Sequence, residues 1–177
     1  MKQQGFTLIE LLTVTAIIMI VGQIASHSIS TNKYWVEPKR LFSAIQEIRN
    51  IAIISRQFAV LCPSSDGHQC VKDWQLPLIM FIDTNNNKQR DTNESIIQTI
   101  TPYTGIERSI EYPRSQIRFD EQGQINGYTG TLKYCSKYNT KGIVLSRVGR
   151  IRYALIFGDD DLPSTSPNNP IICSDKL

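Results

Sequence analysis

Two arginines on either side of an isoleucine are the residues of this sequence best suited to bind an anion. They belong to the segment Gly149-Arg150-Ile151-Arg152, which follows one apolar run and opens another. In a strand, alternate side chains share a face, so Arg150 and Arg152 would lie about 7 Å apart on one face, opposite Ile151. Guanidinium groups bind phosphate oxygens through paired hydrogen bonds. The spacing predicts a phosphate-binding hairpin with Gly149 in its turn.

The chain around this hairpin is basic, although the formal net charge of the whole sequence is only +3. Residues 122–158 contain no Asp or Glu, and their basic residues are Lys133, Lys137, Lys141, Arg147, Arg150 and Arg152. Tyr134 and Tyr138 in the same segment are suited to stack on unpaired bases. The pattern favours nucleic-acid binding. The alternative is a solvated hairpin whose arginines pair with the acidic residues 159–161 or face another protein.

A second polar segment has the spacing of a calcium-binding loop. Oxygen-bearing side chains occupy loop positions 1, 3, 5, 7, 9 and 12, namely Asp83, Asn85, Asn87, Gln89, Asp91 and Glu94. Position 6, normally glycine, is Lys88, which obstructs the sharp turn and adds positive charge. We therefore expect a polar hairpin loop with no metal, and calcium binding is the alternative.

The four cysteines, Cys62, Cys70, Cys135 and Cys173, allow three disulfide pairings. We favour Cys62–Cys70, which closes a short turn-rich loop, together with Cys135–Cys173, which ties the C-terminal tail to the sheet. Zinc binding is the alternative, but the sequence has no Cys-x-x-Cys motif.

Catalytic groupings are absent from the sequence. The two histidines, His27 and His68, have no nucleophile signature nearby, and neither a phosphate-binding nor a dinucleotide-binding glycine motif is present. We expect a protein that is not an enzyme and carries no cofactor.

The N-terminal segment must hold these candidate sites outside the cytoplasm. Residues 6–25 contain one charged residue, Glu10, and as a helix they would span about 30 Å, the thickness of a hydrocarbon core. Lys2 precedes the run, so the positive-inside rule leaves the N-terminus in the cytoplasm. A cleaved signal peptide is an alternative, but Gln23 stands where a small residue is needed. A plain anchor is another, although it leaves a costly carboxylate unexplained.

The rest of the chain predicts a helix followed by an antiparallel sheet. Pro38 should bend the helix or start a new segment. Apolar residues then recur at helical spacing, and Pro63 and Gly67 end the helix. Its apolar stripe consists of Leu41, Phe42, Ile45, Ile48, Ala52 and Ala59. Short apolar runs between turn residues predict strands over residues 74–82, 95–101, 117–119, 130–134, 142–146 and 150–157. The tail, 162–170, reads as a loop.

The leader Gly5-Phe6-Thr7-Leu8-Ile9-Glu10 resembles the class III signal of type IV pilins and type II secretion pseudopilins. The resemblance implies that prepilin peptidase cuts between Gly5 and Phe6, that the new N-terminus is methylated, and that Glu10 pairs with the amine of a neighbouring subunit. A carboxylate and an ammonium that meet in the membrane relieve each other's desolvation. The implied domains are a leader (1–5), a transmembrane and assembly helix (6–30) and an extracytoplasmic domain (31–177).

The body resembles the FimT/GspH branch of minor pilins and pseudopilins over nearly its whole length. The marks are residues 61–70, Asp73-Trp74, residues 81–91 and residues 143–152. The resemblance implies an α+β type IV pilin fold, with a long N-terminal helix on an antiparallel sheet. Its Gly-Arg-x-Arg motif implies DNA binding for natural transformation, and a structural subunit without DNA binding is the alternative. The implied location is the inner membrane and then the pilus surface of a Gram-negative bacterium.

Overall fold

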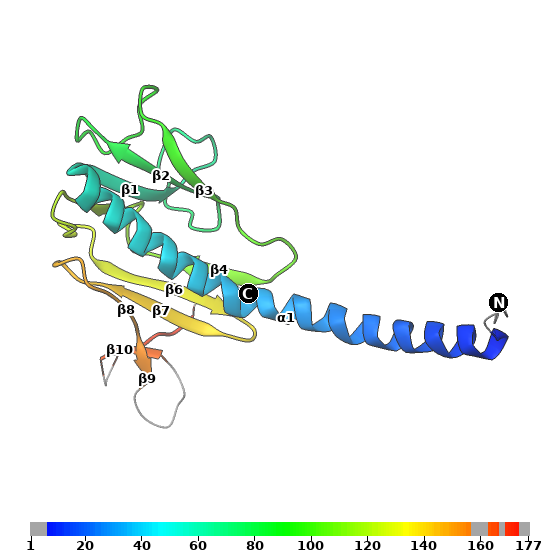
Figure 1. Cartoon of the computed structure of the whole chain (residues 1–177). Helices are drawn as coiled ribbons and strands as arrows, with labels where there is room; N and C mark the ends of the chain where they lie inside the picture. The colour runs from blue at the N-terminus through cyan, green and yellow to red at the C-terminus, as the bar shows by residue number, and fades with distance from the viewer. Residues whose placement is uncertain (1–6, 157–162, 167–168, 174–177) are drawn as a thin grey trace.

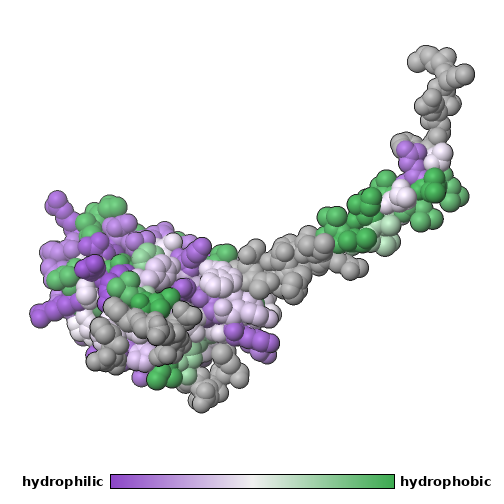
Figure 2. All heavy atoms as spheres, turned by 90° about the horizontal axis from the view of Figure 1, so that it is seen from below, coloured by the Kyte–Doolittle hydropathy of each residue, from purple (hydrophilic) through white to green (hydrophobic). Residues whose placement is uncertain are grey.

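One long helix and eleven short strands form the described part of the protein. The computed structural model describes residues 7–156, 163–166 and 169–173, and the side chains of residues 23–32 lie outside this description. Helix α1, Leu8–Ser55, projects from the domain over its first half and lies across the sheets over its second (Figure 1). Large apolar side chains of residues 8–21 are 50–80% exposed and form the projecting apolar end in Figure 2. The helix therefore has an exposed apolar stretch at residues 8–21 and a second half that packs on the domain.

No helical stretch among the described residues is long and apolar enough to cross a membrane. The predicted membrane segment, 6–30, includes Phe6 and side chains of residues 23–30 that lie outside the description.

Helix α1 continues through Pro38, so of the two predicted alternatives, a bend or a new segment, the new segment does not occur. Figure 1 shows the helix axis changing direction where the exposed half meets the domain. A proline removes one backbone hydrogen bond and crowds the preceding turn, and it commonly bends a helix without ending it.

The helix ends earlier than predicted. Arg56 adopts a left-handed conformation with φ 55°, and its N–H donates to the carbonyl oxygen of Ala52. The chain then enters strand β1, Phe58–Pro63, so the assignment of Ala59 to the helix and the stop at Pro63 and Gly67 are wrong. Because the strand is buried on both faces, its apolar run lacks the alternation that would separate it from a helix.

Two four-stranded antiparallel sheets form the body of the domain. The first has the order β3-β2-β1-β5 and consists of Ile96–Ile100, Leu78–Asp83, Phe58–Pro63 and Ile117–Phe119. The second has the order β4-β6-β7-β8 and consists of Arg108–Glu111, Gly130–Ser136, Thr140–Leu145 and Ile151–Tyr153. A small third sheet has the order β11-β10-β9 and consists of Asn169–Pro170, Pro163–Ser166 and Leu155–Ile156.

The α+β class and the antiparallel pairing agree with the sequence, and each predicted strand overlaps an observed one. Strand β2 starts at Leu78, later than the predicted start at Trp74, because residues 73–76 form a turn in which the N–H of Leu76 donates to the Asp73 carbonyl oxygen (3.3 Å). Strands β1 and β4 were not predicted, and the tail predicted as a loop contains β10 and β11.

The core lies between the packed half of α1 and the two large sheets. Leu41, Ala44, Ile45, Ile48 and Ala52 supply the helix side of this core, and each is at most 3% exposed. The two large sheets supply the other side of the core. Their largest buried side chains are Phe119, Tyr134, Leu61, Met80, Ile117, Leu132 and Ile143. This apolar stripe follows the predicted helical spacing, apart from Ala59.

Two disulfides join the cysteines in the pairing favoured from the sequence. Cys62 bonds to Cys70 and Cys135 to Cys173, with Cα–Cα distances of 5.5 and 5.9 Å, and none of the four is free. In the short Cys62–Cys70 loop, Asp66 accepts backbone N–H bonds from His68 and Gln69, which lower the pKa of Asp66 to about 2. The second bond fixes the tail to strand β6.

Candidate nucleic-acid interface

The turn between β7 and β8, residues 146–150, is held by its own hydrogen bonds. The N–H of Gly149 donates to the Ser146 carbonyl oxygen (2.9 Å), and the N–H of Ser146 donates to the Arg150 carbonyl oxygen (3.1 Å). The Ser146 hydroxyl also accepts the Arg150 N–H (3.1 Å). Gly149 has φ +77°, a conformation that glycine adopts without strain, as the sequence analysis expected of the turn.

This turn is packed against a neighbouring turn and against helix α1. A Cβ placed on Gly149 would lie 1.7 Å from the carbonyl oxygen of Gly123, so only glycine fits there. The same oxygen accepts a hydrogen bond from Nε of Arg49 (3.1 Å), and the N–H of Ile125 donates to the Arg147 carbonyl oxygen (2.9 Å). The hairpin tip is thereby fixed relative to the helix.

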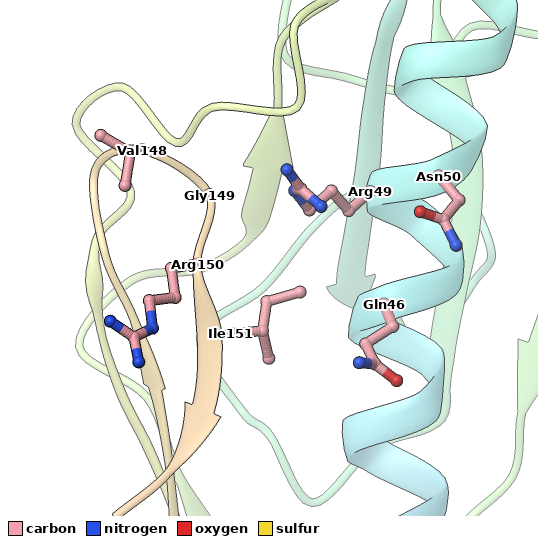
Figure 3. Close-up of a pocket in the computed structure, with 7 residues that line it drawn as sticks. All are labelled: Gln46, Arg49, Asn50, Val148, Gly149, Arg150 and Ile151. Carbon is pink, nitrogen blue, oxygen red and sulfur yellow. The ribbon is translucent and has the colours of Figure 1, made fainter.

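Neighbouring hairpin residues point to opposite sides, as predicted. Figure 3 shows Ile151 directed toward helix α1 and the Arg150 guanidinium directed away from it. Ile151 packs against the core, whereas Arg150 is exposed. Arg147, in the same turn, is also exposed.

A groove with a volume of about 480 Å³ lies between this turn and the helix. Gln46, Arg49 and Asn50 line it from α1, and residues 148–151 line it from the hairpin (Figure 3). The Arg49 side chain extends from the helix toward the turn. Arg49 was not among the predicted site residues, because the sequence gives no signal that this helix position meets the hairpin.

The three arginines here have no carboxylate partner in the part of the chain that the structure describes. Within the described residues the ion pairs are Arg108–Glu37 and Arg118–Asp83, so no described carboxylate lies within 4.0 Å of Arg49, Arg147 or Arg150. The proposed pairing with acidic residues 159–161 falls outside the described residues. Two exposed carboxylates, Glu47 on α1 and Glu121 in the neighbouring turn, belong to the adjoining elements and oppose the positive charge. We call Arg49, Arg147 and Arg150 the arginine cluster.

Arg152 differs from Arg150. It is only partly exposed, and its guanidinium donates to the carbonyl oxygens of Tyr153 and Thr165, at 3.2 Å each. The two arginines predicted to share one face of the strand therefore differ in exposure. Arg152 ties β8 to β10, which leaves fewer of its donors for a ligand.

The predicted lysines do not join the arginine cluster. Lys137 lies in the β6–β7 turn, at the opposite end of β7 from residues 146–150, and the six residues of β7 span about 20 Å. Lys141 pairs with Tyr134 across the strands and shares its helix-facing side. Lys133 pairs with Gly142 on the other face, which is also the face of Arg152, but it lies on β6, two strands away from β8, and its ammonium group donates to the Ile172 carbonyl oxygen (3.4 Å). A run of like charge along the sequence is divided here among different faces of a sheet.

Neither predicted stacking tyrosine lies at the arginine cluster. Tyr134 is 0% exposed within the core, where burial raises its pKa, so it is inaccessible to a base. Tyr138 is 50% exposed but lies in the β6–β7 turn, with its ring edge-on to Tyr34 at 4.9 Å between centroids.

The polar loop 83–94 satisfies its carboxylates internally. Asp83 is buried, accepts N–H bonds from Asn87 and Lys88 (3.0 Å each), and pairs with Arg118 at 3.0 Å. Glu94 accepts from the N–H and the hydroxyl of Thr84 and from the N–H of Asp91. The amides of Asn85 and Asn87 both donate to Asp91. Among the described residues no group of three or more His, Cys, Asp or Glu side chains is placed to hold a metal ion.

At the start of the helix, the carboxylate of Glu10 lies in the first turn, 3.5 Å from both the N–H and the hydroxyl of Thr7. A carboxylate at a helix N-terminus interacts favourably with the helix dipole. Gly5 and Phe6 lie outside the described residues, so the predicted cleavage site stays a prediction.

A long N-terminal helix packed over half its length on antiparallel sheets is the type IV pilin fold, and the chain is a pilin-like protein. Residues 39–149 match the family described as type II transport protein GspH, and residues 1–22 match the prokaryotic N-terminal methylation motif. The chain belongs to the GspH family of minor pilins and pseudopilins, which are structural proteins, and it has the N-terminal motif of a membrane-anchored pilus component processed by prepilin peptidase.

Two solved structures, both crystal forms of the type IV minor pilin FimU from Pseudomonas aeruginosa, have a similar fold. One matches with a TM-score of 0.56 and 15% identity over 70% of this chain and 89% of that chain. The other matches with a TM-score of 0.51 and 15% identity over 66% and 89% of the two chains. No curated protein matches the sequence.

Proposed function

We propose that this protein is a minor pilin that binds extracellular DNA at the β7–β8 hairpin, for uptake in natural transformation. The observation that carries the proposal is the exposed Arg150, which has no described carboxylate within 4.0 Å and stands on a turn that Gly149 fixes beside Arg49. A backbone that is already ordered loses little conformational freedom when one of its side chains binds a phosphate. The hairpin therefore supports phosphate binding better than a flexible loop would.

The arginine cluster presents guanidinium groups both from the hairpin and from helix α1. Arg150 projects on the far side of the hairpin from the helix, while Arg49 reaches the groove from α1, so the two present donors on either side of Gly149 (Figure 3). Arg147 extends the cluster at the tip, and the amides of Gln46 and Asn50 add neutral donors. Phosphate contacts carry no base information, so binding is expected to depend little on DNA sequence.

The same proposal covers the location and the other partners. Cleavage between Gly5 and Phe6 and methylation of Phe6 prepare the subunit, residues 6–30 hold it in the inner membrane of a Gram-negative bacterium, and Glu10 pairs with the amine of a neighbouring pilin. Assembly then carries the extracytoplasmic domain, residues 31–177, to the cell surface. The exposed apolar side chains between residues 8 and 21 support the proposal that this part of the helix is buried in a membrane or in a fibre.

Fluorescence anisotropy of labelled duplexes with the full-length protein in detergent tests the proposal. Arg150→Gln and Arg49→Gln should each weaken binding about tenfold or more, because a hydrogen bond to a charged group contributes about 1.5–3 kcal/mol. Lys72→Gln removes the same charge from an exposed site away from the hairpin and should leave affinity nearly unchanged. Glu121→Gln should strengthen binding, because it removes a nearby negative charge.

A structural subunit of a pilus or of a type II secretion pseudopilus is the second candidate. The exposed apolar half of α1 and the 82% exposed Ile54 on its packed half favour contacts with other subunits. This candidate requires no DNA binding, so equal and weak affinity of the wild type and all four variants would support it instead.

A further inference from the structure

The lysines that lie away from the arginine cluster define a second surface at the other end of the domain. Lys137 and Lys141 belong to the β6–β7 hairpin, and Lys33 and Lys39 belong to helix α1 where it leaves the domain. Figure 1 shows the β6–β7 turn beside the helix at this point. All four lysines are at least partly exposed. Among the described residues this end also exposes one carboxylate, Glu107, next to the start of β4.

Aromatic side chains lie among these lysines. Trp35 is 47% exposed and Tyr138 is 50% exposed, and Tyr138 contacts Tyr34 edge-on. Asn139 fixes the turn to the helix by donating to the Tyr34 carbonyl oxygen (3.2 Å). A groove with a volume of about 430 Å³ runs past Trp35, Pro38 and Tyr153, and Lys39 and Lys141 stand beside it. Aromatic and basic side chains are thus combined on one rigid surface.

The position of this surface along the helix matches the headgroup layer of a membrane. If residues 6–30 cross the hydrocarbon core, their helix is about 37 Å long and tilts to fit a core of about 30 Å, so Tyr34 and Trp35 lie about 5–6 Å beyond the core along the membrane normal. The polar layer on each side of the hydrocarbon core is about 5–7 Å thick. Trp and Tyr concentrate at this depth, and lysines near an anionic membrane surface add electrostatic attraction.

We propose that, before assembly, this surface rests on the anionic phospholipid headgroups of the membrane that holds the helix. Trp35 and Tyr138 lie at the headgroup level, and Lys33, Lys39, Lys137 and Lys141 face lipid phosphates. The proposal rests on the membrane anchoring proposed above. It gives the lysines a role separate from DNA binding and holds the domain close to the membrane with the arginine cluster at the end of β7 farther from it.

Trp35 itself can report the contact, because the other tryptophan, Trp74, is 2% exposed in the core. The full-length protein carrying Trp74→Phe would be placed in nanodiscs of phosphatidylcholine, with or without phosphatidylglycerol. Lipids brominated near the headgroup should quench Trp35 emission more strongly than lipids brominated near the chain end, and phosphatidylglycerol should increase the quenching. Lys39→Gln combined with Lys141→Gln should reduce quenching in the anionic discs, and Lys72→Gln combined with Lys133→Gln should not.

Each other result contradicts the proposal in a distinguishable way. If the protein enters the discs but Trp35 is not quenched, the surface contact is contradicted and anchoring is not. The same holds if the quenching is unchanged by phosphatidylglycerol and by the Lys39 and Lys141 substitutions. Protein that does not enter the discs overturns both anchoring and the contact. Quenching that disappears as protein is concentrated shows that a second subunit covers Trp35 and replaces lipid as the occupant.

Discussion

The α-carbon of Gly149 lies so close to Gly123 that a Cβ on Gly149 would be 1.7 Å from the Gly123 carbonyl oxygen. That oxygen already accepts the Nε–H of Arg49, so one backbone atom joins the hairpin, the neighbouring turn and helix α1. The contact fixes the hairpin that carries Arg150 beside the helix that carries Arg49. The candidate site consequently depends on a packing contact as much as on its charges.

We expect Gly149→Ala to destabilise the domain by about 2 kcal/mol or more, because it combines a left-handed backbone with a direct clash. Gly127→Ala is the matched control, since Gly127 has φ +79° with no atom within 4 Å of an added Cβ. It should cost only the backbone strain, about 1 kcal/mol. Urea unfolding measures both. Equal losses in the two variants would show that the contact with Gly123 is not tight.

Opening the Cys135–Cys173 bond should cost about 4 kcal/mol, because the bond closes a loop with a sequence separation of 38 residues. The double variant Cys135→Ala with Cys173→Ala should therefore have a much lower unfolding midpoint in urea. Cys173→Ala alone should lose nearly as much, since either change removes the bond. An unchanged midpoint in the double variant would contradict this assignment.

Cleavage after Gly5 is expected to need the small residue. Gly5→Leu should leave a full-length precursor in the membrane, which mass spectrometry of the native protein would detect by its retained Met1. Gly22→Leu, farther along the helix, adds the same bulk where no atom lies within 4 Å of an added Cβ, and should be processed normally. Retention of Met1 in the wild type would refute the assignment of a pilin leader.

Glu10→Ala should leave the domain folded and lower the amount of subunit recovered in sheared fibres. The variant leaves the N-terminal ammonium of a neighbouring subunit without its carboxylate in an apolar surrounding, which is strongly unfavourable. Glu47→Ala removes an exposed carboxylate from the packed half of the same helix and is the control. Normal recovery of the Glu10 variant would rule out this role in assembly.

The sequence predicted best those features that depend on local signals. The turn glycine at Gly149, the faces of Arg150 and Ile151 and the helical stripe around Ile45 follow from backbone geometry and periodicity. Strand β1 was missed because its run is apolar on both faces and follows the helix after only two residues, Arg56 and Gln57. The left-handed Arg56 that ends the helix is not a glycine, so its position carries no sequence signal.

Basic residues that are close to the hairpin in the sequence are not the ones that lie close to it in the structure. Lys133, Lys137 and Lys141 are neighbours of the hairpin in the chain, yet Lys137 lies at the far end of β7, Lys141 is on the helix-facing side, and Lys133 lies on β6, two strands away from β8. Arg49, which is distant in the chain, reaches the groove through the packing of α1 on the sheet. Tertiary packing therefore decided which cations belong to the candidate site.

The salt dependence of DNA binding tests the central claim most directly. Each phosphate neutralised on duplex DNA contributes about −0.9 to the slope of log affinity against log salt, so the arginine cluster predicts a slope of about −3 for the wild type. Arg150→Gln should flatten the slope by about one unit. Lys133→Gln should leave it unchanged, and Arg152→Gln should lower stability more than it changes the slope, because Arg152 holds β10. The same affinity and slope for the wild type and a folded Arg49→Gln, Arg150→Gln double variant would contradict DNA binding at this hairpin.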